Sequence, residues 1–331
     1  MKRCFQFLLM FLSLSIFSQQ VYKKEMILMG CVFDITVVAN SQELGDTYIK
    51  MATDEISRIE KIISSWDKKS ETSLVNKYAG VQAVKVSKEL VDLVFRAKKI
   101  SVLTDGAFDI SYASMDRIWK FDGSITKMPS KELISKSVEK VGYENIILDK
   151  KLQTIFLKKE GMKIGFGAIG KGYAADMAKA LLIKNGVVAG VVNASGDMNT
   201  WGKDPQGREW TVAITNPKNK KQAFAVLPIS NKAVVTSGNY EKFILLNNER
   251  YAHIIDPRTG YPSKGILSVS VFADSAELAD ALATSVFVMG VEVGLDRINQ
   301  LKGVECAVVD VNGKLHLSNK LNLKTWENHK K

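Results

Sequence analysis

A glycine-rich loop at residues 163–172 constrains the fold of this chain more than any other stretch. It reads Lys-Ile-Gly-Phe-Gly-Ala-Ile-Gly-Lys-Gly and joins apolar, strand-like runs at residues 154–157 and 162–164 to a helix-like run at residues 173–183. Glycines let backbone N–H groups approach a ligand closely, and the N-terminus of the following helix favours an anion. The loop therefore has the layout of a phosphate-binding site.

Two familiar nucleotide-binding patterns match only part of this loop. The spacing G-x-G-x-x-G, which begins at Gly165, fits a dinucleotide-binding fingerprint, but the next strand, at residues 187–192, ends in Asn193 and not in an acidic residue. A P-loop is excluded by Gly172, which stands where Ser or Thr would hold magnesium. A glycine-rich turn that binds nothing remains an alternative for this loop taken alone.

Composition and charge place the chain among ordinary globular proteins. Its 331 residues, 46% apolar and 24% charged, can bury a large core in one or two domains. The formal net charge of +11 mildly favours anionic partners or substrates. The lysines are scattered and are not interleaved with aromatic residues, so we expect no nucleic-acid partner.

Residues 1–18 have the pattern of a secretory signal peptide. Lys2 and Arg3 precede an apolar run at residues 5–17, which is too short for a membrane span, and the small residue Ser18 follows. We expect cleavage near Ser18. The mature chain is predicted to be exported, in the periplasm, and either soluble or peripherally membrane-associated.

Two of the three cysteines belong to the mature chain. Cys31 ends a stretch similar to a lipid-attachment site, but polar residues 21–25 separate it from the apolar run, so we predict no lipid there. A disulfide between Cys31 and Cys306 is possible in an oxidising compartment, and two separate buried thiols are the favoured alternative.

Hydrophobic periodicity predicts an α+β fold. Apolar residues recur at helical spacing in some stretches and alternate in others. Helices are expected at residues 49–63, 88–103, 130–140, 173–183, 275–289 and 292–301. Strands are expected at residues 31–38, 145–149, 154–157, 187–193, 210–215, 223–228, 233–237, 242–246, 250–255, 265–273, 305–311 and 314–317. Because strands come in runs, we expect mixed or antiparallel sheets with flanking helices, forming one catalytic unit over residues 19–331.

Polar residues gather beside glycine, or at the ends of predicted elements, in four further clusters. Taken singly, each cluster is more often a turn or a helix cap. The clusters lie at residues 104–109, 234–240, 253–260 and 279–284.

Together with the glycine loop, these clusters resemble one family, the ApbE or FAD:protein FMN transferase family. The resemblance runs from residue 29 to about residue 310. Its marks are Met29-Gly, Ser64-Ser-Trp66, Asp105-Gly-Ala-Phe-Asp109, Ile118-Trp119, Gly167-Ala-Ile-Gly-Lys-Gly-Tyr173, Asn193-Ala-Ser-Gly-Asp197, Thr236-Ser-Gly-Asn-Tyr240, His253-Ile-Ile-Asp-Pro-x-Thr-Gly260 and Ala279-Asp-Ala-Leu-Ala-Thr284.

This resemblance implies an FAD site, bound Mg²⁺, and transfer of FMN from FAD to a threonine or serine hydroxyl of an acceptor protein, with release of AMP. The acceptor is expected to be a membrane-associated or exported redox protein. The implied flavin-contacting residues are Met29, Trp66, Ala107, Phe108, Asp109, Gly165, Lys171 and Ile254. The implied metal ligands are Ala168, through its carbonyl, and Asp280 and Thr284, through their side chains.

The chain departs from the family pattern at three positions. Gly165 stands where some relatives carry aspartate, so a side-chain contact is lost there. Trp66 stands where tyrosine is common, which keeps the ring but not the hydroxyl. Cys31 stands where threonine is usual.

His253 is the predicted catalytic base. It is the only histidine before His316, and its pKa range suits proton transfer near neutral pH. Outside the family context, a histidine packed at the end of a strand is the commoner situation.

Spacing on the helix at residues 275–289 supports the metal site independently. Asp280 and Thr284 are four residues apart and therefore lie on one helix face. A carboxylate and a hydroxyl are oxygen ligands of the kind that magnesium takes, and no second acidic cluster is evident in the sequence. The alternative is an aspartate favoured by the helix dipole beside a threonine bonded to a backbone carbonyl.

Two other functions use the same residues. An exported FAD pyrophosphatase would pass FMN to water, giving FMN and AMP, and a non-catalytic FAD-binding protein would do no chemistry. The presence of His253, Asp280 and Thr284 argues against pure binding. Transfer and hydrolysis both remain open from the sequence.

Overall fold

The computed structural model describes residues 19–218, 223–239, 243–246 and 249–323. The predicted signal peptide at residues 1–18, the motif residue Tyr240, and Asn247 and Asn248 between two predicted strands lie outside the described residues.

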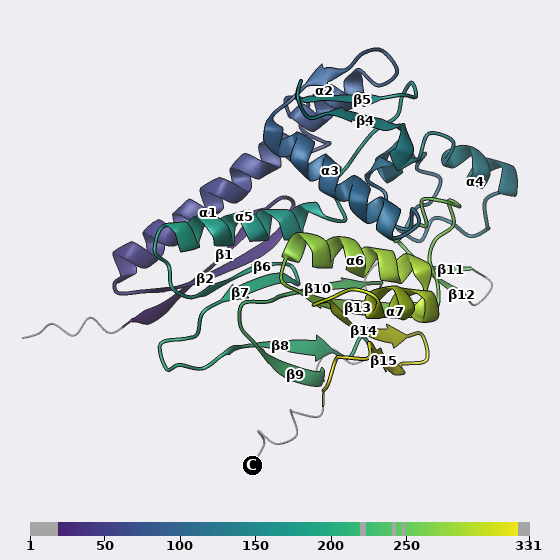
Figure 1. The fold of residues 1–331 in the computed structure, drawn as a ribbon. Coiled ribbons are helices and arrows are strands. Elements are labelled where there is room, and N and C mark those ends of the chain that lie inside the picture. Colours follow the sequence, from purple (N-terminus) through teal and green to yellow (C-terminus); the bar gives the residue numbers. More distant parts are fainter. Residues whose placement is uncertain (1–18, 219–222, 240–242, 247–248, 324–331) are drawn as a thin grey trace, which may run out of the picture.

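An eight-stranded antiparallel sheet forms the centre of the protein (Figure 1). Both early and late parts of the chain contribute to this sheet: β1 and β2 form one edge, and β14 and β15 form the other. In spatial order the strands are β1 (Gln20–Leu28), β2 (Cys31–Ala39), β6 (Gly190–Ala194), β7 (Asp197–Trp201), β10 (Ala233–Gly238), β13 (Ile266–Ala273), β14 (Glu305–Asp310) and β15 (Leu315–Leu317).

Four helices cover one face of this sheet (Figure 1). They are α1 (Gln42–Ile63), α5 (Gly170–Lys184), α6 (Ala276–Met289) and α7 (Val291–Asn299). In α1 the side chains of Ile49, Ile56 and Ile59 recur on one face and are buried against the sheet. The hydroxyl of Ser41 caps this helix by accepting a hydrogen bond from the Leu44 N–H.

A second group of elements packs above α1, α5 and α6 in the view of Figure 1. It contains α2 (Glu71–Lys77), α3 (Lys88–Leu103), α4 (Lys131–Ser137), two 3₁₀ helices, η1 (Ile110–Ser114) and η2 (Tyr143–Asn145), and a small sheet of β3 (Val84–Lys85), β5 (Thr154–Leu157) and β4 (Ile146–Asp149). Two hairpins complete the described fold: β8 (Trp210–Thr215) with β9 (Ala223–Ile229), and β11 (Phe243–Leu246) with β12 (Glu249–Ala252). Among the described residues, no helix is both long enough and apolar enough to cross a membrane.

The predicted α+β class is confirmed, and the described strand pairings are all antiparallel. Most predicted elements are present within three residues of their expected ends. The strand expected at residues 187–193 is shorter, Gly190–Ala194, and the helix expected from residue 173 begins at Gly170. Six elements were not predicted: β1, α2, β3, β7 and the two 3₁₀ helices, η1 and η2.

Cys31 and Cys306 are separate free thiols, as favoured from the sequence, although Cys31 is only partly buried. Cys31 begins β2 and Cys306 lies in β14, and four strands stand between them in the sheet. Neighbouring strands are about 4.8 Å apart, which separates these two strands by roughly 24 Å. A disulfide requires Cα atoms within about 7 Å, so the alternative of a Cys31–Cys306 bond is wrong.

Candidate functional site

A cavity of about 880 Å³ lies where α5, α6, the end of β10 and the η1 segment meet. Its volume is in the upper part of the range that small-molecule and cofactor sites occupy. Ten of the twelve residues predicted for the site line it: Trp66, Ala107, Phe108, Asp109, Ala168, Lys171, His253, Ile254, Asp280 and Thr284.

The other two predicted residues, Met29 and Gly165, do not line this cavity. Met29 lies in the turn between β1 and β2, where its N–H donates to the Glu60 carboxylate, 3.2 Å away. The Gly165 N–H donates to the Ile110 carbonyl at 2.9 Å, and a Cβ at Gly165 would lie 3.0 Å from the Ala113 side chain. Their predicted flavin contacts remain untested, and this geometry gives them roles in packing.

The segment that enters the glycine loop is held by side chains and not by a strand. Met162, Lys163 and Ile164 belong to no strand, contrary to the strand-like pattern. The Ser114 hydroxyl bonds both the N–H and the carbonyl of Lys163, and the Asn76 amide does the same for Ile164. These contacts satisfy the backbone without a neighbouring strand and fix the start of the loop.

Close contact between two helices explains the last glycine of the loop. A Cβ at Gly172 would lie 2.1 Å from the Ala276 carbonyl oxygen, so only glycine lets α5 approach α6 this closely. The Gly172 N–H, in the first turn of α5, donates to the Asp280 carboxylate at 3.2 Å. The N-terminus of α5 thus bonds a protein carboxylate at the cavity wall.

Three charged groups meet at this end of the cavity. Asp197 and Asp280 are nearly inaccessible, and their carboxyl groups are hydrogen-bonded to each other. The Lys171 ammonium forms an ion pair with Asp197. Burial, together with the charge of Asp280, raises the pKa of Asp197 well above its ordinary value. Burial alone would lower the pKa of Lys171, but the two carboxylates raise it.

This arrangement fits a divalent cation. The hydrogen bond between the two carboxyl groups requires a shared proton, and a divalent cation could take the place of that proton and let both carboxylates ionise. Asp280, Thr284 and the Ala168 backbone offer only oxygen ligands, as magnesium prefers. Within the described part of the chain, no group of three His, Cys, Asp or Glu side chains could hold a metal, so backbone, hydroxyl or substrate oxygens would complete the shell.

The predicted flavin contact Asp109 has a structural task. Its carboxylate accepts hydrogen bonds from the Ser111 N–H and the Tyr143 N–H, both at 2.7 Å, and so joins η1 to η2. Burial raises the pKa of Asp109. These two bonds use one acceptor site on each carboxylate oxygen, and each oxygen keeps a second site for a ligand donor.

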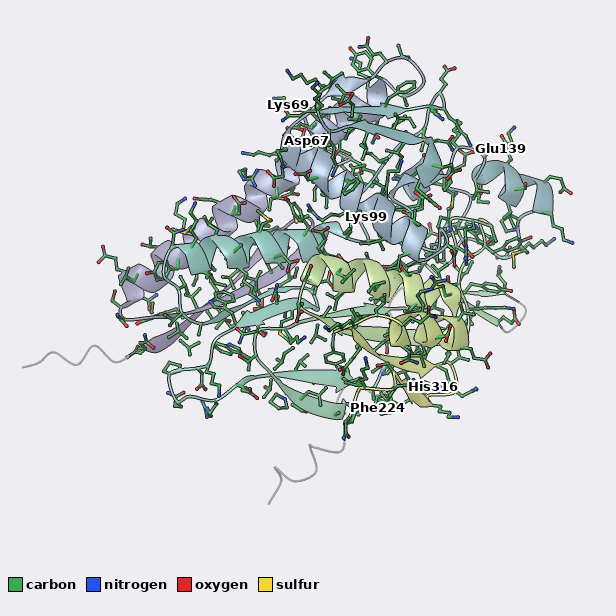
Figure 2. The ribbon with its side chains drawn as sticks, in the orientation of Figure 1. Asp67, Lys69, Lys99, Glu139, Phe224 and His316 are labelled. Carbon is green, nitrogen blue, oxygen red and sulfur yellow. The ribbon has the colours of Figure 1, made fainter. Side chains whose placement is uncertain are left out.

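His253 lies at the cavity just after β12, where a strand to residue 255 was expected. The Phe121 ring packs edge-on against the imidazole, with 6.4 Å between the ring centroids. The other described histidine, His316, lies in β15 and pairs with Asp310 at 2.9 Å. Figure 2 shows His316 beside the strands at the far edge of the sheet, and it does not line the cavity. Of the described histidines, His253 alone lines the cavity and could act there.

An exposed aromatic ring and several cations line another part of the cavity. Trp66 is 76% exposed, and the Arg117 guanidinium lies 4.7 Å from the centre of its ring. Lys140 and Lys163 also line the cavity. Aromatic and cationic groups of this kind suit a planar, anionic ligand.

Several lining residues were missed from the sequence as functional positions. Asp197 and Thr236 lie in motifs quoted for the resemblance, so their position in those motifs was an available signal. Tyr112, whose hydroxyl accepts a hydrogen bond from the Gly167 N–H, carried no such signal. Folding brings Asp197 from a distant part of the chain to Asp280, so the acidic group at this site is larger than the sequence indicated.

The fold and the site define an α+β protein with a large cavity suited to an anionic ligand and a divalent cation. A family model described as the ApbE family matches residues 29–308. The chain therefore belongs to the ApbE family.

Individual relatives agree with this assignment. The FAD:protein FMN transferase of Klebsiella pneumoniae (strain 342) is 29% identical over 301 residues, which cover 90% of this chain and 92% of that protein. The FAD:protein FMN transferase of Escherichia coli (strain K12) is 30% identical over 239 residues, covering 70% of this chain and 68% of that protein.

Solved structures share the fold. The ApbE protein of Thermotoga maritima is 30% identical, with a TM-score of 0.82, and the match covers 93% of this chain and 99% of that chain. The apo form of the Pseudomonas stutzeri flavinyl transferase ApbE has a TM-score of 0.81 at 24% identity, covering 92% of this chain and 96% of that chain. At that identity the second match shows the fold alone.

Proposed function

We propose that this chain is an FAD:protein FMN transferase that moves FMN from FAD to a threonine or serine hydroxyl of an acceptor protein and releases AMP. The proposal rests on one observation: the glycine loop, Asp280, Thr284 and His253 line the same cavity in a chain of the ApbE family. Curated relatives that match most of the chain are named FAD:protein FMN transferases.

Magnesium is part of this proposal. Asp280, Thr284 and the Ala168 carbonyl would hold it, and when bound it supplies positive charge to the phosphate oxygens of FAD. The buried pair of carboxyl groups, Asp197 and Asp280, supports a cation at this place, because a cation could replace the proton that they share.

The chain's own residues carry the remaining steps. The aromatic face of Trp66 and the nearby cations, Arg117 and Lys163, bind and orient the dinucleotide. His253 takes the proton from the acceptor hydroxyl, whose oxygen then attacks the FMN phosphorus as the bond to AMP breaks. If water took the place of that hydroxyl, the same groups would produce FMN and AMP, as in an FAD pyrophosphatase.

Export is the remaining part of the proposal. The leader pattern at residues 1–18 supports secretion to the periplasm, where the acceptor would be an exported or membrane-associated redox protein.

The deciding experiment incubates the purified chain with FAD, magnesium and a peptide that carries a flavinylation-site threonine, and follows the products by mass spectrometry. We expect peptide carrying one FMN together with one equivalent of AMP. A peptide with alanine at the acceptor position should stay unmodified, and EDTA should stop the reaction.

Other outcomes identify the alternatives. Release of AMP and free FMN with an unmodified peptide would identify a pyrophosphatase. Tight FAD binding without any product would identify a binding protein.

A further inference from the structure

One carboxylate outside the cavity, that of Asp176 on α5, makes four hydrogen bonds, three at the N-terminus of α6 and one with Asn199 of β7. Oδ1 accepts from the Ala276 N–H at 2.8 Å and from the Asn199 side chain. Oδ2 accepts from the Ser275 hydroxyl at 2.7 Å and from the Glu277 N–H at 3.0 Å. Asp176 does not line the cavity.

These bonds complete the N-terminus of α6. The first four N–H groups of a helix have no partner within the helical ladder. Asp176 binds those of Ala276 and Glu277, and the Ser275 hydroxyl accepts from the Leu278 N–H at 3.2 Å. The Ala279 N–H then makes the first regular helical bond, to the Ser275 carbonyl at 3.1 Å. Asp176 is therefore the tertiary contact that fixes where α6 begins.

The two helices hold each other reciprocally. The Gly172 N–H of α5 donates to Asp280 of α6, and the Ala276 N–H of α6 donates to Asp176 of α5. On each helix the donor and the carboxylate are four residues apart, which is about one turn. A sliding or rotation of α6 against α5 would break bonds at both ends of this arrangement.

We propose that Asp176 is a positioning residue: it sets the height and rotation of α6, and so places Asp280 and Thr284 at the cavity. Asp280 lies one turn after the N–H groups that Asp176 binds, and Thr284 one turn further. The placement of metal ligands by Asp176 rests on the proposed metal-dependent transfer. The control of the position of α6 by Asp176 does not rest on that proposal.

The test compares Asp176→Ala and Asp176→Asn with the full-length wild-type chain. The first measurement is hydrogen–deuterium exchange over residues 276–284, relative to α1. The second is the magnesium concentration that half-saturates FMN transfer. Asp176→Asn keeps one acceptor oxygen and covers the case in which Asp176→Ala does not fold. Asp274→Asn is the matched control, because Asp274 lies beside the same helix N-terminus but pairs with Lys232.

For Asp176→Ala we expect exchange at least about tenfold faster over residues 276–284, with α1 unchanged. Half-saturating magnesium should rise about tenfold, because the helix that carries the proposed ligands Asp280 and Thr284 would no longer be held in place. Asp176→Asn should show smaller changes in the same direction, and Asp274→Asn none.

Wild-type exchange over residues 276–284 in both Asp176 variants would overturn the inference, as would faster exchange with an unchanged magnesium requirement. If the wild-type chain transferred no FMN, the proposed function would fail, while the exchange measurement would still decide whether Asp176 controls α6.

Discussion

At the residue scale, the carboxylates in and near the cavity have two different roles. Some join elements of the fold, and others can contact a ligand. Asp109 and Asp176 each bind backbone N–H groups and join two elements. Among the described residues, the Asp280 carboxylate accepts one backbone hydrogen bond, from Gly172. It also bonds the Asp197 carboxyl group, and it lies at the cavity wall. Asp280 is therefore the carboxylate best placed to bind a cation.

His253 carries the clearest prediction at this scale. Replacing His253 with alanine removes the proposed base but leaves the glycine loop and the Trp66 region intact. We expect FMN transfer to slow by roughly two to four orders of magnitude, the usual contribution of a positioned base, with FAD affinity retained. Single-turnover transfer rates and FAD titrations check these two effects.

The matched control is His316→Ala, since His316 lies outside the cavity and should leave the transfer rate unchanged. A wild-type rate in His253→Ala would remove this residue from the mechanism. Lost FAD binding would make it a ligand contact instead.

The sequence predicted individual site residues where a motif marked them and missed those defined only by tertiary contacts. Lys171 and Asp280 lie within motifs, and both line the cavity. Asp176 lies on a helix that was predicted, but its main partners, Ser275, Ala276 and Glu277, are about 100 residues away. No local pattern reports a contact of that kind.

At the element scale, an ionic network joins the helices around the cavity. Arg58 of α1 bonds Glu89 of α3 at 2.7 Å, and the Tyr173 hydroxyl of α5 also donates to Glu89 at 2.7 Å. Arg96 of α3 pairs with Glu277 of α6 at 2.7 Å. Glu89 is the member shared by three helices, and its hydrogen bond from Arg58 lowers its pKa.

Replacing Glu89 with glutamine should lower the free energy of unfolding by about 1 kcal/mol at pH 7, since a charge-assisted bond is lost from a partly exposed pair. The pKa of Glu89 is lower in the folded state, so its carboxylate stabilises the fold above its unfolded pKa of about 4.3. That contribution is lost as the pH falls through the folded pKa. The difference between wild type and variant should therefore shrink below about pH 4, as measured by urea unfolding.

Asp54→Asn is the control, because Asp54 forms only an exposed pair with Lys50 on α1. Its effect should stay within about 0.5 kcal/mol. A wild-type advantage over Glu89→Gln that persisted unchanged at pH 3 would contradict the assignment.

Elements with one buried face were predictable, and edge or motif-bearing strands were not. Helix α1 has a regular buried stripe and was found. In β1 the residues Lys23, Lys24 and Glu25 are exposed at the edge of the sheet, so the segment resembled a polar linker. In β7 the polar residues Asp197 and Asn199 are buried by tertiary partners. The sequence of this strand therefore lacks the alternation of apolar and polar residues that marks a strand.

At the scale of the whole molecule, the order of the strands brings the site together. Neighbours β7, β10 and β13 come from three separate parts of the chain, and α5 and α6 pack side by side above them (Figure 1). The α+β class followed from the runs of strands. The strand order could not be predicted in this way, because it depends on long-range pairings that hydrophobic periodicity does not encode.

The same topology bears on the proposed export, because it constrains where an exported chain would begin. Cleavage before Cys31 would remove β1, which pairs with β2 at nine facing positions from Gln20 to Leu28 and packs against α1. Facing pairs contribute roughly 0.2–1 kcal/mol each, so a chain beginning at Cys31 should lose at least about 2 kcal/mol of unfolding free energy. We therefore expect the exported chain to begin near Gln19, without lipid, as measured by intact mass of the secreted protein. Urea unfolding of versions beginning at Gln19 and at Cys31 checks the cost directly. A diacylated Cys31 at the mature N-terminus, or equal stability of the two versions, would refute this assignment.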